Sequence, residues 1–207
     1  QKIKSAANLR SIQQGMVLYA GQNDGYYTGY NPAKASEAGS SDPWRWFGSP
    51  ANHWSMRVET RFAELLPAQF VNPDILLNPA DPVQDKEPYS MGEYDPDNPG
   101  AGEPFTTKHY SYALDEIGAP WTKKPHNLAE WRNNMNSQSV VAGDRLLNPL
   151  PSDWLDPSTY TPMYGGAGSD FSVGVVFNDG HTEFSGDAYF QTEYDGFSNS
   201  NDFIYLR

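Results

Sequence analysis

The stretch FSVGVVFNDGHTEFSG (residues 171–186) carries Asp179, His181 and Glu183 directly after an apolar run. Asp179-Gly180 suits a two-residue type I′ turn, in which both central residues need a positive φ. Such a turn predicts a β-hairpin with Asn178 opposite His181, Phe177 opposite Thr182 and Val175 opposite Phe184. Because side chains alternate along a strand, we expect one apolar face, formed by Val173, Val175, Phe177, Thr182 and Phe184.

The other face of this hairpin would carry Val176, Asn178, His181 and Glu183. His181 and Glu183 could together chelate a metal ion from that face. Short motif matches of this kind are usually structural, so a half-solvated polar face is the favoured interpretation. The stretch therefore predicts a sheet element and not the rim of an active site.

The length, charge and composition of the chain exclude several classes of protein and of structural feature. The chain has 207 residues, enough for one domain with a real core, and a formal net charge of −12 that argues against a nucleic-acid-binding surface. It has no cysteine, so disulfides are excluded. No apolar run approaches the ~20 residues of a membrane helix.

The first residues predict a long helix. Leu9, Ile12, Met16 and Tyr19 recur at helical spacing, so we expect a helix over about residues 2–21, amphipathic in its second half. No Ser, Thr or Asp precedes Lys2 as a cap, which suggests a helix that continues upstream of Gln1.

We expect this helix to be docked from about Leu9 onward and to project or fray before it. Ile3, Ala6 and Ala7 carry little apolar surface with which to anchor the first turns.

The rest of the chain predicts short elements joined by loops. A second helix is expected over about residues 55–66, with Pro67 ending it. Its inward residues would be Val58, Phe62, Leu65 and Leu66. A short strand is expected within DILLNPADP (74–82), and further strands at 109–114, at 139–146, in the hairpin and within DFIYLR (202–207).

A long surface loop is expected over about residues 84–107, which are rich in Pro, Gly and acidic residues. A helix followed mostly by strands indicates the α+β class. We expect a single domain over 1–207, with a helical segment over 1–22 and a helix–sheet body over 23–207.

Five phrases of the chain, taken in order, resemble the bacterial pilin-like proteins with a prepilin-type N-terminus, which are common in planctomycetes and related to type II secretion pseudopilins. SAANLRSIQQGMVLYAGQNDGYYTGY (5–30) is similar to the family's first helix and its Asn-Asp-Gly-Tyr phrase. The later phrases are ILLNPADP (75–82), HYSYALDE (109–116), VVAGDRL (140–146) and VGVVFNDGHTEF (173–184). The matching positions of the first phrase are Asn8, Leu9, Arg10, Ile12, Asn23, Asp24, Gly25 and Tyr26.

Two positions depart from the family pattern. The C-terminal motif has a His, nine residues and then Asp-Gly, but Ser169 stands at the position of the His. Asn78 stands where the family usually has a Cys. No role of either residue is therefore carried over to this chain.

The resemblance implies a structural subunit of a pilus or a pseudopilus, with the first helix packed on a small antiparallel sheet. It implies no enzyme activity, no catalytic residue and no cofactor site. The expected partners are other copies or other pilin-like subunits, the inner-membrane assembly machinery, and the membrane through an upstream segment; nucleic acid is not one. The expected location is the bacterial cell envelope, either with the body in the periplasm or in an extracellular filament.

Calcium is the one cation that the resemblance suggests, because major pseudopilins hold it in a C-terminal loop. An EF-hand register starting at Asp95 fails, since Pro99 would stand at position five, which needs Asp or Asn, and Thr106 at position twelve, which needs Glu. QTEYDGFSNSND (191–202) offers oxygen donors, of which Glu193, Asp195 and Asp202 are the calcium candidates. A polar turn without a metal is the alternative for this segment.

Two other classes of function remain open from the sequence. Trp44, Trp46 and Trp54, with the many tyrosines, could stack on sugar rings in a secreted carbohydrate-binding module, although tryptophans more often fill a core. A glycoside hydrolase would need a pair of carboxylates, and nothing singles out a pair among the 26 acidic residues. The four histidines show no metal-ligand spacing.

Overall fold

The computed structural model describes residues 1–29, 58–83, 85–90, 105–115, 131–134, 136–145, 163–164, 172–186, 189–190 and 202–203. The helices are α1 (Lys2–Gly21) and α3 (Val58–Ala63), and the short 3₁₀ helices are η3 (Pro73–Leu76) and η4 (Thr107–His109). The strands are β1 (Tyr112–Leu114), β2 (Val140–Asp144), β3 (Val173–Phe177), β4 (Thr182–Ser185), β5 (Tyr189–Phe190) and β6 (Asp202–Phe203).

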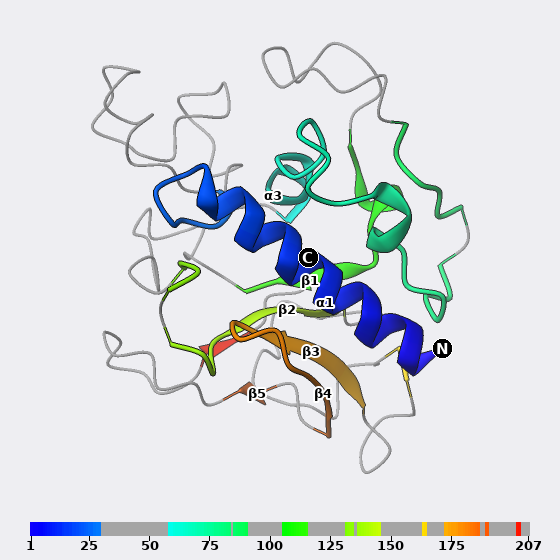
Figure 1. The fold of residues 1–207 in the computed structure, drawn as a ribbon. Helices are drawn as coiled ribbons and strands as arrows, with labels where there is room; N and C mark the ends of the chain where they lie inside the picture. Colours follow the sequence, from blue (N-terminus) through cyan, green and yellow to red (C-terminus); the bar gives the residue numbers. More distant parts are fainter. Residues whose placement is uncertain are drawn as a thin grey trace.

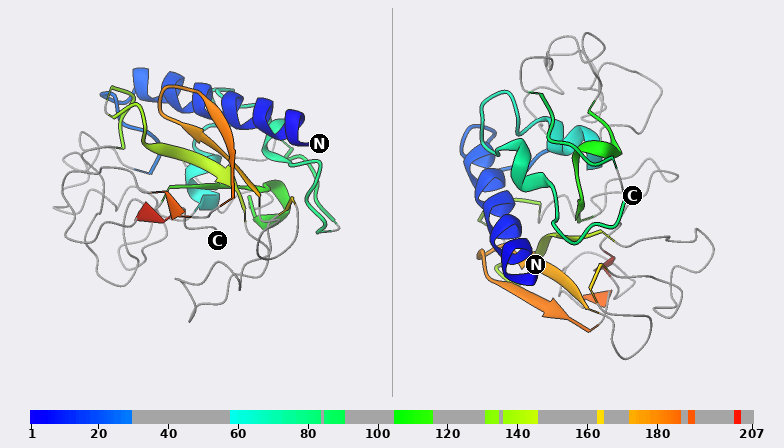
Figure 2. Two further views of the ribbon diagram at one scale, coloured as in Figure 1. Left: turned by 90° about the horizontal axis from the view of Figure 1, so that it is seen from below. Right: turned by 90° about the vertical axis from the view of Figure 1, so that its right-hand side faces the viewer.

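Strands β1 to β4 form one antiparallel sheet in the order β1-β2-β3-β4, and β5 pairs with β6 in a separate ribbon. Helix α1 runs across one face of the larger sheet, where it contacts β2, β3 and β4 (Figure 1). Two further views place α1 at the periphery of the molecule, with the strands on one side of it only (Figure 2). The α+β class, the first helix and the strands expected near 109–114, 139–146 and 172–186 are confirmed.

The core lies between α1, α3 and the sheet. Leu9, Ile12 and Met16 of α1 are fully buried and belong to the same apolar cluster as Phe62 of α3 and Val176 of β3. The second helix is shorter than expected, but Leu65 and Leu66 are buried in the turns that follow it, as the helical spacing predicted. The described residues of α1, α3 and the sheet therefore share one apolar core, and α1 covers its outer side.

Strand β3 is buried on both faces. A Cβ at Gly174 would lie 3.3 Å from Leu9 Cδ1, so Gly174 faces α1, and Val176 shares that face by alternation. Val173, Val175 and Phe177 face the other way and are also buried. The expected half-solvated polar face is therefore wrong for β3, and a continuous apolar run is what a strand buried on both sides needs.

The hairpin turn differs from the expected type I′ turn. Gly180 N donates to Phe177 O (2.9 Å) and Phe177 N donates to His181 O (3.0 Å). Gly180 has a φ of +83°, whereas Asp179 is not among the described residues with a positive φ. The loop is therefore a type I turn followed by a glycine bulge, which contains one residue more than a type I′ loop.

The longer loop shifts the register of β4 by one residue. Val175 faces Glu183 and Gly174 faces Phe184, so the expected pairs of Phe177 with Thr182 and of Val175 with Phe184 are wrong. A shift of one residue moves every side chain of a strand to the opposite face. Phe184 consequently lies on the α1 side of the sheet, and Glu183 is exposed.

The strand expected within residues 74–82 is also wrong. Residues 73–76 form η3, because Pro73 suits a first helical position and the Asn72 side chain accepts from Asp74 N (2.9 Å). The loop expected over 84–107 ends at η4, where Thr106 and the buried His109 form a reciprocal cap. Residues 91–104 of that loop lie outside the described part of the chain.

Candidate functional site

The outward face of α1 is exposed to solvent. Ile3 is 89% exposed and Leu18 is 58% exposed. Ala7, Arg10 and Gln14 are exposed between them. Because these five residues follow one another at intervals of three or four, they form one continuous stripe, which we call the outer stripe.

The second half of α1 is held by apolar contacts. Ile12 and Met16 are fully buried, and the Tyr19 ring packs edge-on against Phe70 at 6.0 Å. A Cβ at Gly15 would lie 2.8 Å from Phe70 O, so only glycine permits this close approach. This half of the helix is an ordinary component of the core.

The first two turns of α1 are held by polar contacts instead. The buried Ser5 hydroxyl donates to Asp144 Oδ1 at 2.7 Å. Asn8 Nδ2 donates to Leu77 O and to Tyr112 Oη, both at 3.1 Å. The expectation that the helix frays before Leu9 is therefore wrong, because buried polar groups dock a segment that has little apolar surface.

The same contacts correct the expected amphipathicity of α1. Its buried face includes Ser5, Asn8 and Gln13, whereas Ile3 and Leu18 are exposed. The division between an apolar and a polar face is therefore only partial.

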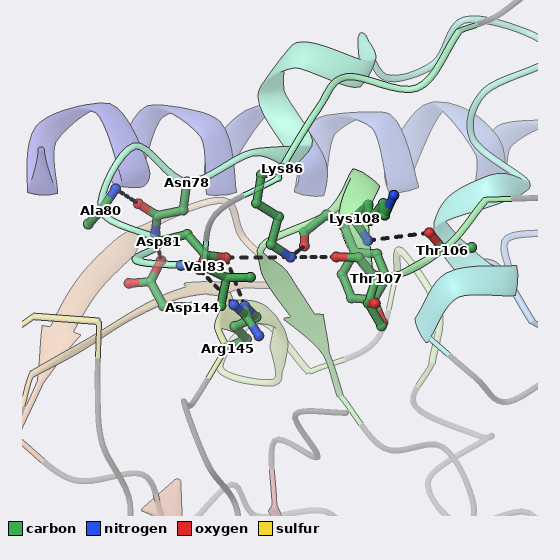
Figure 3. Close-up of polar contacts among 11 residues, drawn as sticks. Asn78, Ala80, Asp81, Val83, Lys86, Thr106, Thr107, Lys108, Asp144 and Arg145 are labelled. Carbon is green, nitrogen blue, oxygen red and sulfur yellow. Dashed lines mark hydrogen bonds and ion pairs between the residues drawn. The ribbon is translucent and has the colours of Figure 1, made fainter.

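Asp144 is the centre of this attachment, and its side chain is fully buried. Its Oδ1 atom accepts from Ser5 and from Asn78 Nδ2 (2.6 Å), and its Oδ2 atom accepts from Gly174 N (2.7 Å). Asn78 Oδ1 in turn accepts from Tyr164 Oη (2.8 Å). We call these five residues the Asp144 cluster; Asn78 and Asp144 are drawn beneath α1 in Figure 3.

Burial raises the pKa of Asp144 to about 6. The hydrogen bonds from Ser5, Gly174 and Asn78 and the charge of Lys2 act in the opposite direction. Burial also raises the pKa of the neighbouring Tyr164 hydroxyl. The carboxyl therefore titrates close to neutral pH, although three donors surround it.

A second polar group ties the segment after η3 to β2 and η4. Arg145 binds both oxygens of Asp81, with Nε 2.8 Å from Oδ2 and Nη2 2.6 Å from Oδ1. Lys86 Nζ lies 3.6 Å from Asp81 Oδ2 and donates to Tyr110 O at 2.6 Å and to Thr107 O (Figure 3).

These contacts move two pKa values. Burial alone would raise the pKa of Asp81, but hydrogen bonds led by Arg145 hold it below its usual value. Burial and the charge of Arg145 lower the pKa of Lys86. Because Asp81, Lys86 and Arg145 bind one another or backbone oxygens, we assign these three residues a structural role.

At the hairpin tip, the His181 side chain contacts two neighbouring residues of the hairpin. The His181 ring stacks on Phe177 at 4.1 Å, and His181 Nδ1 lies 2.5 Å from Asp179 Oδ1. Among the residues that the structure describes, no group of three or more His, Asp or Glu residues could hold a metal ion.

The other proposed site residues are not brought together by what the structure describes. Glu193 and Asp195 lie outside the described residues, and the backbone of Asp202 pairs with Phe190 in the β5–β6 ribbon. Trp44, Trp46 and Trp54 also lie outside them. Calcium at 191–202 and sugar stacking by the tryptophans stay predictions.

Sequence reasoning missed the Asp144 cluster, although a signal was present. Ser5 and Asn8 are three residues apart and fall on the same helical face as Leu9 and Ile12. Asp144 closes an otherwise apolar strand. Polar residues at core positions predict buried hydrogen bonds, because a buried polar group without a partner is costly.

Comparison of the chain with models of protein families, with curated proteins and with solved structures produced no match in any of the three. Within the described segments, no helix combines the length and the apolar character needed to cross a membrane.

Proposed function

We propose that this chain is the body of a pilin-like structural subunit, which assembles into a pilus or a pseudopilus through its first helix. The observation that carries this proposal is the arrangement of α1, which covers one face of an antiparallel sheet at the periphery of the molecule (Figure 2). The outer stripe of this helix, from Ile3 to Leu18, is exposed. An assembly helix needs both properties: one face fixed to its own body and another face available to a neighbour.

The order of the sequence phrases supports the same proposal. The first pilin-like phrase covers most of α1 and the turn that follows it, and VVAGDRL and VGVVFNDGHTEF supply β2 and the β3–β4 hairpin that pack beneath this helix. In this proposal the partners are other copies or related subunits and an inner-membrane assembly machine. The subunit belongs to the bacterial cell envelope and carries no catalytic activity.

Cross-linking in the cells that produce the protein tests this function. The chain has no cysteine, so a single Ile3→Cys or Leu18→Cys substitution introduces a unique thiol on the outer stripe. Treatment of these cells with a heterobifunctional cross-linker, which joins this thiol to a lysine amine of a neighbouring subunit, should give a ladder of multiples of the subunit mass in the envelope fraction. Glu183→Cys, on the exposed side of β4, is the matched control and should cross-link much less.

Two results would contradict the proposal. One is that both stripe variants remain monomeric while the protein is abundant in the cells. The other is that Glu183→Cys forms the ladder and the stripe variants do not, because assembly would then use the sheet and not α1.

A further inference from the structure

We propose that the Asp144 cluster is a pH-sensitive latch, which holds the first two turns of α1 on the sheet in acid and loosens them at neutral pH. This inference is independent of the proposed function. The two halves of α1 are attached to the body by different kinds of contact. Residues 2–8 contact the body through polar groups, whereas Leu9, Ile12 and Met16 are fixed in the apolar core.

The Asp144 carboxyl binds the most deeply buried side chain of the first two turns of α1. Ser5 is their most deeply buried residue, and its hydroxyl is bound to Asp144 and to Asn78, at 2.7 and 3.2 Å. Gln1 and Lys2 add exposed hydrogen bonds, to Pro79 O (3.3 Å) and Ser172 Oγ (2.9 Å), and Lys2 Nζ lies 5.0 Å from the centre of the Phe184 ring. Detachment of residues 2–8 would therefore uncover Asp144 while the rest of α1 stays docked.

Few titratable groups face Asp144 within the described residues. Lys2 of α1 is the charged group that acts on it, and it lowers the pKa of the carboxyl. Tyr112 of β1 and Tyr164 contribute hydroxyls whose pKa values burial raises, so both are neutral at physiological pH. The facing residues of the η3 side and of β3, Asn78 and Gly174, carry no titratable group.

The direction of the effect follows from linkage. In the docked state burial raises the pKa of Asp144 from 3.8 to about 6. Opening of the first two turns returns the carboxyl to water and its pKa toward the ordinary value, so the docked state binds the proton more tightly. Docking is therefore favoured below the ordinary pKa, and this advantage is lost as the pH rises toward about 6.

Amide hydrogen exchange of the full chain tests the latch. Each exchange rate is divided by the intrinsic rate at the same pH, which leaves the opening equilibrium of that amide. Between about pH 4 and about pH 7, the protection of residues 5–9 should fall by up to about 100-fold, the factor that a pKa difference of about two units allows. The protection of residues 13–19, in the apolar half, should change less than about threefold.

Two variants identify the responsible group. Asp144→Asn removes the titration while keeping the side-chain shape, and should make the protection of residues 5–9 nearly independent of pH. Glu183→Gln removes an exposed carboxylate from β4 and should keep the pH profile of the unsubstituted chain.

Three outcomes would overturn the proposal: an equal change in both halves of α1, a rise in the protection of residues 5–9 with pH, or an unaltered pH profile in Asp144→Asn. If Asp144→Asn does not fold, the difference between the two halves in the unsubstituted chain decides the question by itself.

Discussion

The two halves of α1 are attached to the same sheet by different physics. Beyond Leu9 the helix is held by buried apolar side chains, among them Ile12 and Met16, whose contribution grows with the area removed from water. Before Leu9 it is held by Ser5 and Asn8, whose contribution depends on hydrogen-bond partners.

A helix can therefore be docked on a sheet even where its apolar pattern is weak. Apolar contacts are insensitive to pH and tolerate small shifts. Hydrogen bonds to a buried carboxyl are directional and depend on its charge. A single helix can therefore combine a permanent attachment with a conditional one.

Truncation of the apolar half should give the largest effect. Ile12→Ala removes a fully buried side chain, so the free energy of unfolding should fall by about 2–5 kcal/mol. Chemical denaturation followed by circular dichroism measures it. Leu18→Ala, on the exposed face of the same half, is the control, with a change within about 0.5 kcal/mol. Equal losses in the two variants would contradict the assignment of the core face.

Removal of the Ser5 hydroxyl should have an intermediate effect. Ser5→Ala leaves the buried Asp144 with one donor fewer, and the loss of a hydrogen-bond partner of a buried polar group costs about 1–3 kcal/mol. The matched control is Ser11→Ala, because the Ser11 hydroxyl bonds to Ala7 O within the helix and is half-buried. Urea melts are made at about pH 4, where the first two turns of α1 are held on the sheet, and a loss no larger than that of Ser11→Ala would mean that the polar attachment is not stabilising.

Asp81, which lies away from α1, should contribute to stability with a pH dependence opposite to that of Asp144. Asp81→Asn should reduce stability by about 1 kcal/mol at neutral pH, because Arg145, which is itself partly exposed, loses its ionic partner. The pKa of Asp81 is lowered from 3.8, so its contribution is present above that value and is lost as the pH falls through the folded pKa.

Urea melts of Asp81→Asn and of the unsubstituted chain, at neutral pH and near pH 3, measure this difference. It should shrink in acid, whereas the contribution of Asp144 becomes favourable there. A difference between the two proteins that grows in acid would contradict the pairing of Asp81 with Arg145.

The outer stripe should give the smallest effect on stability. Ile3→Ser changes a side chain that is 89% exposed, so the free energy of unfolding should move by no more than about 0.5 kcal/mol. A thermal melt of the isolated chain checks this. A loss above about 1 kcal/mol would show that Ile3 is packed in solution, and the outer stripe would then not be free for a neighbour.

Elements with a local sequence pattern could be predicted from the amino-acid sequence alone. Apolar residues at helical spacing placed α1 at residues 2–21, and the apolar run before Asp179-Gly180 placed the β3–β4 hairpin. Both are recognisable because hydrophobic periodicity depends only on neighbours along the chain.

Tertiary structure decided the remaining features. The glycine bulge after Asp179 set the register of β4, and the capped Pro73 turned an expected strand into η3. The contact of Ser5 with Asp144 spans 139 positions of the chain and has no local pattern. A buried hydrogen bond is defined by two distant groups that meet, and only the folded backbone shows which groups do.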